Sequence, residues 1–518
     1  MSTNPAPSWV SALVAVGLAA ALLWSPRSID SPVEAQGRGA AQGRGAGQGR
    51  GAAPTRDLAR ELAMKIDAPF TLAAVGDIFG AMAPIVPLEE PRLHSLLKII
   101  RDADVGFANA ESSIADLPRF TGPFGGLLAP KAAAADMRAM GITVANRANN
   151  HTDDNGAEGM FETNALLDEV GIMHAGTGRN LEEARDAAYL MTKKGRVGLV
   201  GLMPISENAP GGNQGFSFNR TAATSRSGNM GGRPGLNPLR LTTYNIVSAE
   251  EFQALKKIRD AVMARRGEVS VPLDLPRDNA DRLELFGKNY KIGAKTGDWS
   301  YEMNAGDLRE NLRSIRNGKF FADFMMVSVH AHQGSYAFQQ YSFDNSTPAF
   351  LVEFAHAAID AGADAFLGQG VHTIRGIEIY KGKPIFYGLS NFAFYMNTPI
   401  GASAGGGESD LTRAERAQAG YDRPGGLNNR DNMEALLTTS RYEGGKLVEV
   451  RVYPADVGID QRPISKIGIP LTPTPDIARQ ILERVQRLSK PFGTNMTIEN
   501  GVGVIRVAAA QTASAGGR

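Results

Sequence analysis

The chain has 518 residues, of which 55 are basic and 54 acidic, so its formal net charge is +1. This balance argues against a chain-wide electrostatic partner such as nucleic acid. The sequence has no cysteine, which excludes disulfides and thiolate metal sites, so any metal ligand must be His, Asp, Glu, Asn or Gln. An apolar content of 43% is typical of a globular body with a sizeable core, and the length allows two or three domains, or one large domain with insertions.

Residues 1–35 predict a secretory signal peptide or a membrane anchor. Val10–Trp24 is an apolar run, shorter than the ~20 residues that a comfortable membrane span needs. The small-residue stretch 33–35 offers a cleavage site, although no Lys or Arg precedes the apolar run. Both interpretations send the chain out of the cytoplasm, to the periplasm or the cell surface. Residues 36–55 repeat Gln-Gly-Arg-Gly, which predicts a disordered Gly/Arg-rich linker.

From residue 56 onward, apolar runs alternate with segments of helical periodicity. Strands are predicted over 70–75, 105–108, 142–145, 196–203, 324–329, 365–367, two segments within 376–394, a hairpin at 436–453, and 503–507. Helices are predicted over 56–66, 92–101, 132–140, 159–169, 249–265, 307–317, 349–361 and 476–488. Alternating strands and helices indicate an α/β layered fold.

The same pattern divides the chain into a main domain and a C-terminal part. We expect the main domain to cover residues 56–400, with a loop insertion at 210–238. A Gly-rich loop would follow at 401–432, and residues 433–518 would supply strands and a helix that complete the fold. Loops of this length are usually functional or disordered, and both could cover a site.

Polar side chains follow five of the predicted strands. They are Asp77; Asn109 with Glu111; Asn150 with His151; His330 with His332; and Gln369 with His372. Ligands bind at the carboxyl ends of strands in layered α/β folds. Carboxylate, amide and imidazole groups at five such ends suit one or two divalent metal ions. Taken singly, each group is equally well explained as a turn, a helix cap or a core histidine.

His330 and His332 lie close together in sequence at the end of one predicted strand. Because side chains alternate along a strand, we expect only one of the two rings to face the site. We favour His332, which lies nearer the strand's end, and expect His330 to be structural. The histidines in helix-like or peripheral stretches are also expected to be structural; they are His94, His174 and His356.

Five segments carry a family resemblance. They are AAVGDIF from Ala73, VGFANAESSIAD from Val105, ANNHTDDNG from Ala148, VSVHAHQGSY from Val327, and GADAFLGQGVHTIRGIEIYKGKPIFYGLSNFAF from Gly362. In these segments the chain resembles the CapA capsule-synthesis family, named for poly-γ-glutamate capsule production. That family is similar in fold and motif order to the calcineurin-like metallophosphatases. The resemblance implies a four-layer α/β/β/α sandwich of metallophosphatase type.

By analogy with dinuclear metallophosphatases, the resemblance also implies roles for the polar residues. Asp77 and His372 would bind a first divalent ion, Asn150 and His332 a second, and Glu111 would bridge the two. His151 would act as a general acid or transition-state stabiliser, oriented by Asp154. Asn109, His330 and Gln369 are weaker candidates. The ions would be Mn, Zn, Fe or Mg.

Two positions depart from the metallophosphatase pattern. Phe79 stands where the first motif carries a histidine, and Gln369 stands where the last motif carries one. A Gln oxygen is a poorer ligand for transition metals than imidazole. These departures leave two ions, one ion or none as open alternatives.

The sequence therefore favours an exported CapA-like protein that acts in the synthesis, export or trimming of poly-γ-glutamate or a related anionic cell-surface polymer. As an enzyme, it would catalyse metal-dependent hydrolysis of a phosphoester or a γ-glutamyl amide. The alternative is a non-catalytic subunit that binds the polymer or a membrane synthase complex and has a degenerate metal site. A third hypothesis is an exported phosphodiesterase unrelated to capsule polymer.

Overall fold

The structure is a computed structural model. It describes residues 57–79, 84–125, 127–206, 232–266, 280–334, 345–393, 430–458 and 467–507. The predicted signal or anchor and the linker lie outside the described residues, as do 210–231 of the predicted insertion and all of 401–429. Within the described part of the chain, none of the helices is both long and apolar enough to cross a membrane.

The helices of the described residues lie where the sequence predicts them, with ends shifted by a few residues in most cases, except α5, which was not predicted. They are α1 (Leu58–Leu62), α2 (Pro91–Arg101), α3 (Ala132–Met140), α4 (Gly156–Glu169), α5 (Leu181–Arg185), α6 (Ala249–Arg266), α7 (Ala305–Phe321), α8 (Ala349–Ala361) and α10 (Pro475–Ser489). Short 3-10 turns occur at Arg430–Met433 and Lys490–Phe492. The end of α8 has a local cause, because Gly362 adopts a φ of 119° and places the chain in the left-handed conformation.

One sheet has nine strands, in the order β22-β23-β21-β20-β1-β2-β5-β6, with β19 paired to β1. Its strands are β1 (Phe70–Ile78), β2 (Val105–Ala110), β5 (Val144–Asn146), β6 (Met173–Ala175), β19 (Asn391–Ala393), β20 (Glu434–Glu443), β21 (Lys446–Asp456), β22 (Thr497–Glu499) and β23 (Val502–Arg506). The neighbours β1, β2, β5 and β6 run parallel, so their carboxyl ends lie at one edge.

The other large sheet has ten strands, in the order β12-β13-β11-β9-β15-β16-β18-β17, with β14 paired to β11 and β8 to β9. Its strands are β8 (Ala188–Met191), β9 (Arg196–Ser206), β11 (Pro238–Val247), β12 (Arg282–Leu285), β13 (Lys288–Ile292), β14 (Trp299–Met303), β15 (Phe324–His330), β16 (Ala365–Gln369), β17 (Ile377–Tyr380) and β18 (Lys383–Phe386). Two small ladders pair β3 (Ser113–Ala115) with β4 (Leu128–Pro130), and β7 (Thr177–Gly178) with β10 (Gly235–Leu236).

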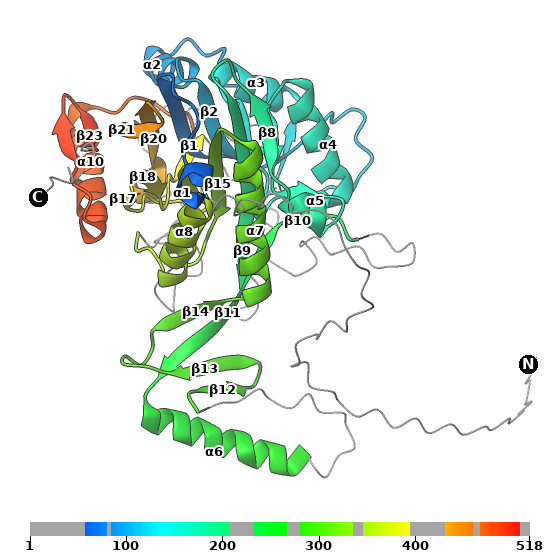
Figure 1. The fold of residues 1–518 in the computed structure, drawn as a ribbon. Helices are drawn as coiled ribbons and strands as arrows, with labels where there is room; N and C mark the ends of the chain where they lie inside the picture. The colour runs from blue at the N-terminus through cyan, green and yellow to red at the C-terminus, as the bar shows by residue number, and fades with distance from the viewer. Residues whose placement is uncertain are drawn as a thin grey trace, which may run out of the picture. The chain divides into compact units, whose positions relative to one another are not determined.

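Three large apolar clusters form most of the core, and each lies between two neighbouring layers of the sandwich. A central cluster joins side chains of both sheets, including Phe70 and Phe107 from one and Phe324 and Met326 from the other. A second cluster packs α2 and α3 onto the outer face of the nine-stranded sheet, and a third packs α7 and α8 onto the outer face of the ten-stranded sheet (Figure 1). The predicted α/β/β/α sandwich is therefore confirmed.

Strand register places the polar residues of the two sheets in rows. In the nine-stranded sheet, Asp77 of β1 pairs with Asn109 of β2 on one side and with Asn391 of β19 on the other. In the ten-stranded sheet, His330 of β15 pairs with Gln369 of β16. Parallel neighbours therefore bring residues from distant parts of the chain to one edge of the sandwich, which is the position where ligands bind in such folds.

Several strands were not predicted from the sequence. The clearest case is the group β11 to β14, which joins α6 at a small apolar cluster around Phe252 and Leu283. Every residue of β13 is only half-buried, so its sequence lacks the apolar run by which buried strands are recognised. A second difference concerns β1, which was expected to end before Gly76 but continues to Ile78, so that Asp77 lies within the strand.

Candidate metal centre

Two carboxylates lie at the centre of the site, and their surroundings differ. Asp77 is fully buried, and its two oxygens accept hydrogen bonds from Asn109 Nδ2 at 2.8 Å and from the Gly370 backbone N–H at 3.1 Å. Glu111 is also fully buried, but neither of its carboxylate oxygens has a hydrogen-bond partner. Burial raises the pKa of Glu111 well above its usual value, and the nearby charges of Asp77 and Asp154 raise it further. His330 Nε2 lies 3.5 Å from Glu111 Oε1, but that ring is neutral, so Glu111 is a buried acid that lacks a compensating positive charge.

A fully buried arginine fixes the backbone on both sides of Glu111. Arg147 Nη1 donates hydrogen bonds to the carbonyl oxygens of Ala110 and Ser112, the second at 3.1 Å. Burial lowers the pKa of Arg147 to about 10. Its guanidinium points at backbone oxygens and is not paired with the Glu111 carboxylate. The loop that carries Glu111 is thus held in place while its side chain stays available to a cation.

His330 and His332 face the same site, which corrects the expectation that only one of them would do so. Their Nε2 atoms are 3.0 Å apart, and Asn150 Oδ1 lies 2.8 Å from Nε2 of His330 and 3.2 Å from Nε2 of His332. Residues two apart along a strand point to the same face, so the sequence argument applied the strand period wrongly. Burial lowers the pKa of His330 to about 3 and that of His332 well below its usual value. Both rings are therefore neutral, which is the form that binds metals.

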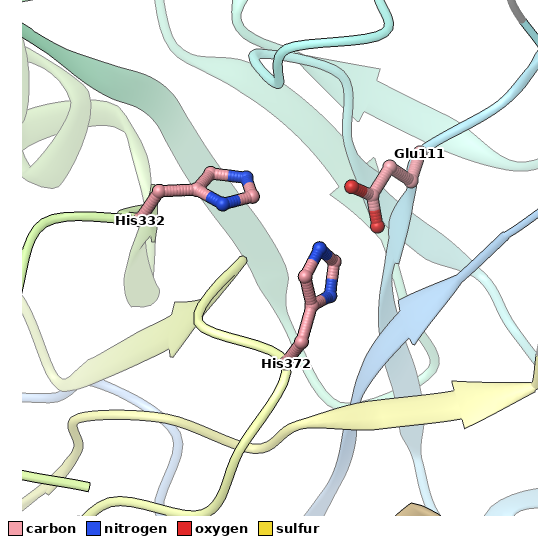
Figure 2. Close-up of side chains that lie close together, drawn as sticks. All are labelled: Glu111, His332 and His372. Carbon is pink, nitrogen blue, oxygen red and sulfur yellow. The ribbon is translucent and has the colours of Figure 1, made fainter. Parts of the chain in front are cut away.

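Two sets of side chains bring ligand atoms within 4.8 Å of one another, and Glu111 belongs to both. One set contains Glu111, His332 and His372; the other contains Asp77, Glu111 and His330. Figure 2 shows the first set, with both rings and the carboxylate directed toward a common space. His372 Nδ1 also lies 3.6 Å from Asp77 Oδ2, so the two sets adjoin.

The chemistry of these donors fits a divalent cation. Carboxylate oxygens and neutral imidazole nitrogens are the common ligands of Zn, Mn and Fe in proteins. The two unpartnered oxygens of Glu111 are the strongest indication, since a buried charge without a partner is costly. When such an ion is bound, Glu111 would be the ligand common to both sets.

His151 lies beside these ligands and is oriented by Asp154. His151 Nδ1 donates a hydrogen bond of 2.6 Å to Asp154 Oδ2, and the same oxygen accepts a bond of 3.0 Å from the Leu127 backbone N–H. Asn150, which precedes His151 in sequence, contacts His330 and His332 through Oδ1, and the Phe79 ring lies edge-on to both His151 and His372. His151 is half-buried, so it combines a fixed orientation with access to solvent.

The two residues that depart from the metallophosphatase pattern, Phe79 and Gln369, both lie beside candidate site residues. The Phe79 ring stands edge-on to His151 and His372, with ring centroids 5.4 and 6.3 Å away. The Gln369 amide nitrogen donates a 2.7 Å hydrogen bond to Ser328 Oγ, and its Oε1 has no partner. Gln369 therefore faces the space between the sheets beside His330, with which it is paired across the strands.

A set of asparagines whose role the sequence did not reveal supports the candidate ligands. Asn149 donates to Asn109 Oδ1 at 3.3 Å and to the Ala110 carbonyl at 2.9 Å, and Asn146 donates to Asn109 Oδ1 at 2.9 Å. These bonds fix the Asn109 amide, so that its Nδ2 faces Asp77. Asn391 Oδ1 lies 2.7 Å from His372 Nδ1. The adjacent pair Asn149-Asn150 was visible in the sequence, but the role of each depends on which strands are neighbours.

The remaining histidines lie away from the metal centre, as expected. His94 Nε2 lies 2.8 Å from the Leu88 carbonyl, and His174 Nε2 lies 3.3 Å from Asp168. His356 stacks on Tyr380 with ring centroids 3.8 Å apart, and its Nε2 lies 3.0 Å from Glu378.

A four-layer sandwich with carboxylate and imidazole groups converging between its sheets defines the class of protein. The family described as bacterial capsule synthesis protein PGA_cap matches residues 71–396, and the chain belongs to this family. This confirms the CapA resemblance.

Individual relatives and one solved structure are also similar. The uncharacterized protein y4uA of Sinorhizobium fredii is 36% identical over 479 residues, which cover 87% of this chain and 96% of the relative. The capsule biosynthesis protein CapA of Bacillus anthracis is 23% identical over 254 residues, covering 49% of this chain and 40% of CapA. A structure of a candidate 5'-nucleotidase from Staphylococcus aureus, in complex with alpha-ketoglutarate, has 10% identity and a TM-score of 0.30 over 62% of this chain and 48% of that chain.

Proposed function

We propose that the chain is an exported, metal-dependent hydrolase that acts on an anionic cell-surface polymer such as poly-γ-glutamate. The observation that carries this proposal is Glu111, a fully buried carboxylate with two unpartnered oxygens, shared by two sets of candidate ligands. Membership of the capsule-synthesis family supports the class of polymer. The apolar run near the amino end supports export, either to the periplasm or to the cell surface.

The residues of the site would have two roles in hydrolysis: most would bind the ion, and one would donate a proton. A divalent ion bound there supplies a Lewis acid for the carbonyl or phosphoryl oxygen of the substrate. Asp77, Glu111, Asn150, His330, His332 and His372 would hold the ion. His151, oriented by Asp154, would donate a proton to the leaving group as a general acid.

The test is turnover with and without His151. Purified full-length chain, supplied with Mn, Zn, Fe or Mg, should cleave poly-γ-glutamate or a phosphoester, and His151→Ala should lower kcat by about 100-fold or more. His151→Ala should still bind the metal, because this ring belongs to neither set of candidate ligands. His356→Ala is the matched control, since His356 lies on α8 away from the site and should leave kcat unchanged.

A second candidate function is a non-catalytic subunit that binds the polymer or a membrane synthase complex. The observation that favours it is the pair of replaced ligands: Phe79 places a carbon ring beside His151 and His372, and Gln369 turns its amide toward Ser328. Such a subunit would bind poly-γ-glutamate equally well with and without His151 and would show no turnover with any of the four metals. Turnover of small phosphoesters without cleavage of the polymer would instead support an exported phosphodiesterase.

A further inference from the structure

Four large apolar side chains are exposed together at one place on the ten-stranded sheet and α7. Tyr189 and Met191 of β8 are 37% and 67% exposed, and Phe320 and Phe321 at the end of α7 are 65% and 57% exposed. We call these four residues the Phe321 patch. Isolated apolar residues are common on protein surfaces, whereas several in contact indicate a surface that binds a partner.

Arg196 shows that the four residues form one continuous patch. Its Nε donates to Met191 Sδ at 3.3 Å, and its Nη1 donates to the Phe321 carbonyl at 3.4 Å. Its guanidinium also lies 5.9 Å from the centroid of the Tyr189 ring, and the Phe320 and Phe321 rings are 5.1 Å apart. Aromatic rings, a methionine and an arginine therefore share one surface, at the junction of β8, β9 and α7.

Exposed basic residues border the patch, together with the acids Asp186 and Asp323. Lys193 lies in the turn between β8 and β9, and Arg316 lies one helical turn before Phe320 on α7; both are exposed. Asp323 accepts a hydrogen bond from the Arg196 backbone N–H at 2.8 Å. The three cations Arg196, Lys193 and Arg316 outnumber these two acids, so the border has a small positive excess, which is complementary to an anionic partner.

The chain enters the described domain beside this patch. The Lys65 backbone N–H donates to the Asp323 carbonyl at 3.0 Å, directly after the end of α7. Helix α1 also packs against α7, and Leu58 on α1 is 50% exposed. A membrane-held segment that precedes α1 would tether the domain within a linker's length of the bilayer, where this patch can dock.

We infer that the Phe321 patch docks on the surface of a lipid bilayer that contains anionic headgroups. Aromatic rings, with an apolar body and a polar edge, are favoured at the level of the headgroups, and Lys and Arg next to them bind anionic lipid. The position of the chain entry favours a bilayer over a protein partner as the occupant, because the apolar run Val10–Trp24 precedes it. This surface lies apart from Glu111 and does not depend on the proposed hydrolysis.

The absence of cysteine makes a direct test possible in the full-length chain. Met191→Cys is labelled with an environment-sensitive fluorophore and mixed with vesicles of 7:3 phosphatidylcholine and phosphatidylglycerol. The emission should shift to the blue, and lipids that carry a quencher on the acyl chain should reduce it several-fold. Ile258→Cys on α6, which is 48% exposed, is the matched control and should show neither change on the same vesicles.

A second set of variants separates the patch from the apolar run at the amino end. Adding Phe320→Ser and Phe321→Ser to the Met191→Cys chain should abolish the blue shift, although the chain remains on the vesicles through its apolar run. A label at residue 191 that stays in water on vesicle-bound protein would overturn the inference and leave a protein partner as the occupant. Failure of the full chain to bind the vesicles at all, or an equal signal from both labels, would overturn it as well.

Discussion

Asn391 holds His372 through a hydrogen bond of 2.7 Å between Asn391 Oδ1 and His372 Nδ1. Asn391 Nδ2 donates to the Asn432 carbonyl at 3.2 Å, so the amide oxygen must face the histidine. The bond places a proton on Nδ1 and leaves Nε2 free to face Glu111 and His332 (Figure 2). His372 also has a φ of 54°, a strained conformation that its surroundings maintain.

Removing this bond should weaken metal binding while leaving the fold intact. Asn391→Ala should lower the affinity for Mn or Zn by about 10- to 100-fold, because a ring without its partner loses its tautomer and orientation. Asn391→Asp keeps an acceptor and should retain most of the affinity. Isothermal titration calorimetry measures both, with Asn289→Ala in β13 as the control. Equal affinity for Asn391→Ala and the unmodified chain would show that Asn391 does not orient His372.

Substitution of Phe79 tests whether a histidine at this position would add a metal ligand. Its ring lies edge-on to both His151 and His372, so Phe79→His should place an imidazole within reach of the same centre. We expect a higher metal content per chain, measured by mass spectrometry of the dialysed protein. Phe79→Leu also removes the ring but adds no ligand, and it should not change the metal content. A Phe79→His chain that binds no more metal than Phe79→Leu would contradict this geometry.

The neutral state of His330 predicts how stability depends on pH in the absence of metal. Burial lowers the pKa of His330 to about 3 in the folded chain, while in the unfolded chain it is close to 6.5. Between these two pKa values, His330 binds a proton in the unfolded chain but not in the folded chain. The free energy of unfolding therefore decreases as the pH falls below 6.5. The loss for this one group between pH 7 and pH 5 should be about 2 kcal/mol.

Urea unfolding at pH 7, 6 and 5 in EDTA measures this loss. His330→Asn cannot take up the proton, so its free energy of unfolding should fall less steeply than that of the unmodified chain. His356→Asn controls for the removal of any histidine. Parallel pH profiles for the His330→Asn chain and the unmodified chain would mean that His330 is not held neutral.

The sequence predicts the fold well wherever one physical signal dominates. Helix α8 was located correctly at both ends, because its apolar face is continuous and Gly362 ends it. β13 and β14 were missed, because their mostly half-buried residues lack an apolar run. Local patterns thus recover elements that bury a whole face, and they miss strands that depend on neighbours for their stability.

The candidate site was recovered in outline. The five groups of polar residues were identified from their places after predicted strands, and they do meet at one edge of the sandwich. Asn391 was missed because its pairing with Asp77 is a register between strands that lie far apart in the chain. The preference for His332 over His330 was wrong, since the spacing of two residues already places both on the same face.

Glu111 and Glu434 form a matched pair for testing the role of the central acid. Both are fully buried, but Glu434 has a cationic partner in Arg484, whereas the oxygens of Glu111 have no hydrogen-bond partner. Glu434→Gln should destabilise the chain, because Arg484 loses its buried acidic partner and keeps only the more exposed Asp431. It should not alter the stabilisation that added metal provides.

The most direct measurement is the stability of Glu111→Gln with and without metal at pH 8. In EDTA, this variant should be more stable than the unmodified chain by about 1–2 kcal/mol, because it no longer carries a buried acid without a partner. Added Mn or Zn at about 100 times its Kd should stabilise the unmodified chain by about 2.7 kcal/mol and the variant far less. A variant that is less stable in EDTA, yet is stabilised by metal as much as the unmodified chain, would contradict the assignment of Glu111 as the central ligand.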